Sequence, residues 1–237
     1  MKKLVVLLLV LSGISQVQAQ FFSNLFNKES LVNLENFDKQ TLSWGYTVGF
    51  NSYDFKFEYL SENGSTDVLV NKNVGFNVGL IGDARINDYI NLRLEPTLIM
   101  TERELIFPGF VDESDYLRSV RTTYIHVPLL VKFSTKRLNN IKPFVVGGLS
   151  NSFNISANED HPEDNSVGRF RMMSSALNYE LGFGIDIYMY FFKFTPSIRG
   201  VFAITDELVR DFDPNSPHTS NISSMKSRGV FINFTFQ

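Results

Sequence analysis

The chain has 237 residues, with 22 lysine and arginine against 25 aspartate and glutamate residues, and this mildly acidic balance argues against a nucleic-acid partner. It has no cysteine, which excludes a disulfide framework and processing as a lipoprotein. It has 23 phenylalanines and 9 tyrosines without long apolar blocks, a composition typical of the outward-facing strands of a membrane barrel.

The first residues have the pattern of a secretory signal. Lys2 and Lys3 precede an apolar stretch over residues 4–11, and the small residues up to Ala19 fit a cleavage site before Gln20. The apolar stretch is well short of the ~20 residues that a membrane-spanning helix needs. We therefore predict a cleaved signal peptide over residues 1–19 and export to a bacterial envelope.

Residues 20–42 are expected to form a periplasmic segment ahead of the main domain. Apolar residues recur between Phe21 and Phe37 at a spacing compatible with a short amphipathic helix. Such a helix would dock on the base of the main domain or on a partner protein.

Alternation with a period of two residues recurs from residue 43 to the C-terminus and predicts strands. We expect eight, over about 43–51, 73–85, 89–103, 122–134, 142–153, 174–190, 192–204 and 229–237. The apolar parity changes sides between Phe50 and Tyr53, which indicates a bulge or a rim extension of the first strand.

The connections between these strands alternate between long and short. Those over residues 52–72, 104–121, 154–173 and 205–226 are long and polar, whereas the remaining connections are short. Outer-membrane barrels pair long extracellular loops with short periplasmic turns, so the pattern places both mature termini in the periplasm. Loop residues 104–115 and 158–164 are acidic with some aromatic neighbours, and form either solvated rims or partner contacts.

A soluble β-sandwich or lipocalin-like barrel would also alternate. The polar face here is poor in Lys and Glu and rich in Gly, Ser, Thr and Asn, which favours an eight-stranded antiparallel outer-membrane β-barrel over residues 43–237. Aromatic residues also gather at the predicted periplasmic strand ends, as a membrane-interface girdle requires. These are Trp44, Tyr89, Phe133, Phe144, Tyr190, Phe192 and Phe236.

Charged residues recur on the faces predicted to point inward. They are Arg93, Glu95, Lys132, Glu180, Asp186, Lys193 and Arg199. Because side chains fill the interior of an eight-stranded barrel, we expect a paired network that plugs the lumen, with a conduction pathway as the alternative. Buried charges must be paired, and four bases against three acids nearly balance.

No motif predicts a metal, a cofactor, a small-molecule substrate or a catalytic residue. His126, His161 and His218 lie on a predicted strand and in two loops, without ligand spacing. His126 could act as the base of a barrel-borne acyl hydrolase, together with a serine and an acid. A histidine hydrogen-bonded inside the lumen is the favoured interpretation.

Three stretches resemble a known superfamily. They are Tyr124-Ile-His-Val-Pro-Leu-Leu-Val-Lys-Phe133, Lys142-Pro-Phe-Val-Val-Gly-Gly148 and Tyr179-Glu-Leu-Gly-Phe-Gly-Ile-Asp-Ile187. They are similar to the small outer-membrane barrels, although His126 stands where a glutamate is common. Trp44-Gly-Tyr-Thr-Val-Gly-Phe-Asn-Ser-Tyr-Asp-Phe-Lys-Phe57 and the four long loops resemble the PorT family within that superfamily.

Membership of the PorT family would imply a non-enzymatic outer-membrane component required for type IX protein secretion and gliding motility. Its expected partners are outer-membrane lipid and other components of the secretion machine. The alternatives are a general structural or adhesion barrel and a lipid-modifying enzyme of the outer membrane.

Overall fold

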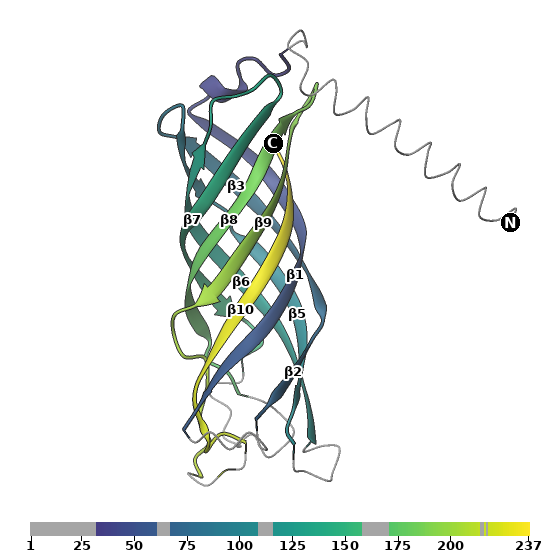
Figure 1. Cartoon of the computed structure of the whole chain (residues 1–237), viewed down its shortest axis with the longest axis vertical. Helices are drawn as coiled ribbons and strands as arrows, with labels where there is room; N and C mark the ends of the chain where they lie inside the picture. Colours follow the sequence, from purple (N-terminus) through teal and green to yellow (C-terminus); the bar gives the residue numbers. More distant parts are fainter. Residues whose placement is uncertain (1–31, 61–66, 109–115, 158–170, 214–215, 217) are drawn as a thin grey trace, which may run out of the picture.

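Ten antiparallel strands close into one barrel in the computed structural model (Figure 1), which describes residues 32–60, 67–108, 116–157, 171–213, 216 and 218–237. The strands are β1 (Leu42–Tyr59), β2 (Leu69–Lys72), β3 (Val74–Arg85), β4 (Ile90–Leu94), β5 (Thr97–Ile106), β6 (Leu117–Ser134), β7 (Ile141–Asn154), β8 (Ser175–Tyr188), β9 (Lys193–Ala203) and β10 (Ile222–Phe236). Within the described residues, no helix has the length and apolar character needed to span a membrane.

The ring has eight positions because two of them are each shared by two strands. β4 and β5 occupy one position and are separated at Pro96, which cannot donate to a ladder; both pair with β6 in one continuous register. β2 and β3 occupy another position. The terminal strand β10 pairs with β1, and β1 pairs with β3, so the ring closes. The predicted eight-stranded antiparallel barrel is thus confirmed.

The barrel has a one-residue shift of register, but not in the first strand, where a bulge was one of the two expectations. Pairing between β1 and β10 is unbroken until Glu58, so the parity change after Phe50 is not a bulge. Instead, the register with β5 shifts by one residue between β3 and β2, where Asn73 separates the two strands. Such a slip turns the following side chains to the opposite face.

The two ends of the barrel differ in their connections. The short connections and the C-terminus lie at one end, the upper end in Figure 1, which we call the turn end. The strand ends that the long connections join lie at the opposite end, which we call the loop end.

Strands continue into three of the four segments predicted to be long loops. β1 extends to Tyr59, β5 to Ile106 and β10 begins at Ile222, whereas the connection after β7 was placed correctly. β1 has 18 residues, well beyond the ~9–11 that a transmembrane strand needs.

Over these extensions the inward face is apolar, so the first strand has the predicted rim extension. Phe55, Leu105 and Met225 are each at most 3% exposed and belong to one cluster inside the barrel, which we call the loop-end core. The remaining buried members of this core are Val68, Phe107, Val120, Met172, Leu208 and Ile222.

The N-terminal segment lies against the turn end. Its described part, residues 32–41, contains a single turn of 3-10 helix, η1 (Phe37–Lys39), rather than the predicted amphipathic helix. The first part of that prediction, residues 21–31, and the predicted signal peptide lie outside the described residues.

Candidate functional site in the barrel lumen

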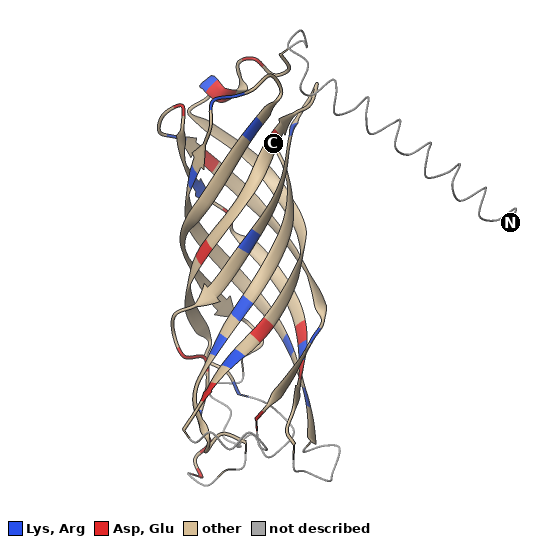
Figure 2. Ribbon diagram, viewed as in Figure 1, with Lys and Arg blue, Asp and Glu red and all other residues tan. Residues whose placement is uncertain are grey.

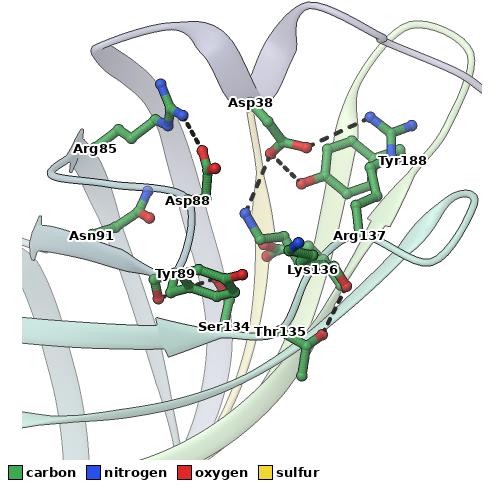
Figure 3. Close-up of polar contacts among 12 residues, drawn as sticks. Asp38, Arg85, Asp88, Tyr89, Asn91, Ser134, Thr135, Lys136, Arg137 and Tyr188 are labelled. Carbon is green, nitrogen blue, oxygen red and sulfur yellow. Dashed lines mark hydrogen bonds and ion pairs between the residues drawn. The ribbon is translucent and has the colours of Figure 1, made fainter.

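Asp38 holds the N-terminal segment across the turn end (Figure 3). Its Oδ1 accepts a hydrogen bond from the Tyr188 hydroxyl at 2.5 Å, and its carboxylate lies 3.7 Å from both the Arg137 and the Lys142 cationic groups. The Phe37 ring lies 4.6 Å from the Lys193 Nζ atom, inside the rim. We call residues 32–40 in this position the turn-end plug.

The Arg137 side chain binds the backbone of the turn-end plug. The guanidinium donates to the carbonyl oxygens of Asn33 and Leu34, and its carbon lies 3.7 Å from the centre of the Tyr188 ring. Asn33 also donates to the Tyr188 carbonyl oxygen at 3.0 Å. The plug is therefore held by Arg137, in the connection between β6 and β7, and by Tyr188 at the end of β8, and it covers the turn-end mouth of the lumen.

A chain of ion pairs crosses the lumen on the inner side of the turn-end plug. Arg93 donates twice to Asp83 Oδ2, at 2.7 and 3.1 Å, and once to Glu95 at 3.3 Å. Arg199 donates to the other oxygen of Glu95 at 2.7 Å and lies 3.0 Å from Glu180. These five side chains are at most 5% exposed. Burial of this degree is tolerated because each charge has an opposite partner.

The remaining predicted lumen charges belong to the same layer. Lys132 donates to Asp186 at 2.5 Å, and Asp186 also accepts from the Thr195 hydroxyl at 2.8 Å. Lys193 is 4% exposed and lies beneath Phe37. The structure therefore places all seven predicted charges inside the barrel, where together with Asp83 they form what we call the charged layer.

The sequence reasoning missed Asp83, the acid that completes this layer. With it, four acids balance four bases, where the predicted set had three acids. Asp83 continues the inward face of β3 after Asn77, but the apolar Ile81 between them, also fully buried, interrupts the polar pattern. Counting every second residue past that interruption would have found it.

Phe144 does not belong to the predicted outer girdle. It is 4% exposed, and its ring centre lies 4.2 Å from the Lys132 Nζ atom and 5.5 Å from the Arg93 guanidinium carbon. Its neighbour Val145 is 57% exposed and faces outward instead. The ring therefore covers cations inside the lumen, an attractive arrangement because the face of an aromatic ring is negative.

The other six girdle residues lie near the turn end with outward or rim positions. Trp44 and Tyr190 are the most exposed, at 69% and 76%. Tyr89, Phe133 and Phe192 are also exposed, and the Phe236 ring stacks on Tyr46 with 5.2 Å between ring centres.

His126 lies in an arrangement that superficially resembles a catalytic triad. Its Nε2 is 2.7 Å from Glu180 Oε1 and its Nδ1 is 2.8 Å from the Ser152 hydroxyl, which the sequence reasoning did not single out. A triad needs an open position beside the nucleophile for the reacting carbonyl. All three residues are at most 5% exposed. The side-chain amide of Asn178 also donates a 2.9 Å hydrogen bond to the Ser152 hydroxyl. The arrangement is suited to packing rather than to acyl transfer.

The other histidines form no site with it. His161 lies outside the described residues, and His218 is buried at the loop end with its ring 5.1 Å from that of Phe107. Among the described residues, no three histidine or carboxylate side chains are grouped so that they could hold a metal ion.

Arg103 is the largest fully buried side chain and lies between the charged layer and the loop-end core. Its guanidinium carbon is 3.7 Å from the centre of the Phe55 ring, and it donates to the Tyr124 hydroxyl and to Ser227 at 2.9 and 3.1 Å. Ser227 in turn donates to Glu207, in the connection after β9, at 3.0 Å. Burial raises the pKa of the Glu207 carboxyl above its ordinary value, although the Arg103 charge opposes the effect.

The lumen is thus closed at successive levels by the turn-end plug, the charged layer, the aromatic residues around Tyr53 and Phe231, and the loop-end core. What the barrel exposes is its outer face, where large apolar side chains recur along the strands.

Comparisons with known proteins identify the family through one family model. The family model described as "Outer membrane protein beta-barrel domain" matches residues 18–209. The chain is similar to the solved structure of the outer membrane protein OprG from Pseudomonas aeruginosa, with 14% identity, 82% of this chain and 93% of that chain covered, and a TM-score of 0.46. It is also similar to Neisserial surface protein A, with 9% identity, 83% and 98% coverage, and a TM-score of 0.46. No curated protein matches the sequence.

Proposed function

Because the chain belongs to the outer membrane protein beta-barrel domain family, we propose that it is a non-enzymatic outer-membrane accessory of type IX protein secretion and gliding motility. The motifs that resemble the PorT family support the assignment to this machine. The family places the barrel in the outer membrane, where its apolar outer face contacts lipid.

The filled lumen is the observation that supports an accessory role over a conduit. The charged layer leaves Arg93, Glu95 and Arg199 at most 5% exposed, and the loop-end core closes the barrel again beyond it. The interior of an eight-stranded barrel is just wide enough for side chains or one small ligand, which is far too narrow for an exported protein. Exported cargo must therefore pass elsewhere, and this protein contributes through its outer surfaces.

The proposal includes an orientation. The turn end, with its short connections and exposed aromatic residues, faces the periplasm, and the loop end faces outward. Residues 1–19 are removed on export. Contacts with other secretion components would use the loop end, the lipid face or the turn-end plug.

The deciding experiment deletes the gene in its native host and measures secreted cargo and gliding, with a plasmid-borne copy of the gene as the control. We expect both activities to be lost and then restored by the plasmid. Unimpaired secretion would contradict the proposal.

The same strain separates the alternatives. A structural or adhesion barrel would leave secretion normal and alter envelope integrity or attachment. If the protein is a lipid-modifying enzyme, lipid A acylation would differ between the wild type and the deletion strain. A plasmid-borne copy carrying His126→Ala would then fail to restore the acylation.

A further inference from the structure

Basic side chains gather on the outer face of β1 and β10 and at the edge of β2 that faces β1, close to the loop end. On the described residues of these three strands, Lys56, Lys72, Lys226 and Arg228 are accompanied by two carboxylates, Asp54 and Glu58. Figure 2 shows these blue and red bands close together on the lower part of β1 and β10. We call these six residues the rim cluster.

One carboxylate of this cluster serves two cations. Asp54 Oδ2 accepts from Arg228 at 2.7 and 2.9 Å, and the same oxygen lies 3.1 Å from Lys72 Nζ. The Asp54 side chain is only 11% exposed, whereas those of Lys72 and Arg228 are 50% and 52% exposed. The two cationic groups are thus fixed on either side of one atom, with one positive charge left over and facing outward.

The other three residues of the cluster, Lys56, Lys226 and Glu58, also have an excess of one positive charge. Lys56 lies directly opposite Lys226 across the β1–β10 ladder, a pairing of like charges that is destabilising in an antiparallel sheet. Glu58, two residues further along β1, accepts a hydrogen bond from Lys56 at 3.0 Å. An anion bound between the two lysines would remove the repulsion.

The neighbouring carboxylates do not supply that anion. On the far side of β2, Glu104 accepts from Asn71 at 2.8 Å, and Glu102 is paired with Arg121 at 2.8 Å. The excess of two positive charges on the rim cluster therefore has no partner among the nearest outward-facing acids of the described strands.

The cluster borders an apolar hollow of about 280 Å³. Phe202, Gly229 and Val230 line it together with Asp54, Lys72 and Arg228. From there toward the turn end the outer face is apolar, with Val230 and Ile232 53% and 44% exposed. Cations at the edge of an apolar wall match a lipid that has an anionic head and acyl chains.

We propose that the rim cluster binds the phosphate group of a membrane lipid, with part of an acyl chain lying in the hollow. A guanidinium binds phosphate through two parallel hydrogen bonds, and a lysine supplies a point charge to another oxygen. In the proposed orientation, on which the identity of the lipid rests, this lipid is a phosphorylated glycolipid of the outer leaflet. It would tie β1 to β2, between which no ladder is formed in the described residues beyond Ser52.

The test measures binding of bisphosphorylated lipid A to the full mature chain in detergent by native mass spectrometry. The variant is Lys72→Gln with Arg228→Gln, and the matched control is Arg121→Gln, an 80% exposed arginine that forms a one-to-one pair on the same face. We expect at least about tenfold weaker binding by the double variant, since two charge-assisted contacts are lost, and unchanged binding by the control.

Three results would overturn the proposal. They are equal binding by the double variant, equal binding of lipid A without its phosphates, and displacement of the lipid by millimolar inorganic phosphate, which would indicate a site for a free anion. Folding is checked by the shift in gel migration on boiling, and Lys72→Gln alone replaces a double variant that fails to fold. The binding is measured without secretion, so its outcome is independent of the proposed function.

Discussion

Removing Arg199 would test whether the lumen is dry. Its guanidinium contacts Glu95 at 2.7 Å and Glu180 at 3.0 Å, and all three side chains are at most 5% exposed. In Arg199→Met, Glu95 keeps only Arg93, at 3.3 Å, and Glu180 keeps His126. Breaking a buried pair by removing one partner costs about 3–5 kcal/mol, because the remaining charge stays buried and uncompensated.

The assay is urea unfolding in lipid vesicles, with the folded fraction measured by gel migration without boiling. Arg121→Met is the control, because an exposed ion pair contributes about 0–1 kcal/mol. Adding Glu95→Gln to Arg199→Met should recover part of the loss, with a coupling of about 0.5–3 kcal/mol. A cost of Arg199→Met as small as that of the control would mean that water solvates these charges, and the reasoning for a filled lumen would fail.

Three further outcomes are expected. The wild-type chain and a variant lacking residues 32–40 both form no steady channel in planar bilayers, because the deeper layers remain; a steady conductance of either would contradict this. Asp38→Ala loses the Tyr188 hydrogen bond and two longer ion pairs, so limited proteolysis should cleave the turn-end plug at least several-fold faster, whereas the exposed Lys39→Ala serves as an unchanged control. Because burial raises the pKa of Glu207, its contribution to stability is complete below about pH 4.3 and is lost as the pH rises through the raised pKa. The melting temperature of Glu207→Gln should therefore depend less on pH between 4 and 8 than that of the wild type.

The strands of the barrel wall could be predicted from the sequence because successive residues of each strand face two different environments. On β8, for example, Leu181 is 62% exposed while its neighbour Glu180 is 1% exposed. Lipid outside and a packed polar interior place opposite demands on successive residues, so a simple period of two carries the information. The same contrast identified the seven lumen charges.

The pattern fails where the environment changes along a strand. Beyond Asn51 the inward residues of β1 become Tyr53 and Phe55, because the barrel projects past the apolar belt and must fill its interior with apolar side chains. Alternation then has the same period with the opposite parity, which the sequence reasoning interpreted as a bulge or a rim extension of the first strand. Phe144 was misplaced for a related reason: an aromatic residue at a strand end suits either an interface girdle or a cation inside, and only the register decides.

The filled interior restricts how this barrel can act on other molecules. In the part of the chain that the structure describes, ion pairs around Arg93 and the loop-end core fill the lumen at two levels. The strand extensions pack around this apolar core, so they form one continuous structure instead of a set of independent loops. The charged residues Asp54, Lys72 and Arg228 lie on these extensions and pair with one another. A partner or lipid that recognises this protein would therefore meet a fixed pattern of charges on a stiff sheet, and binding there would cost little conformational entropy.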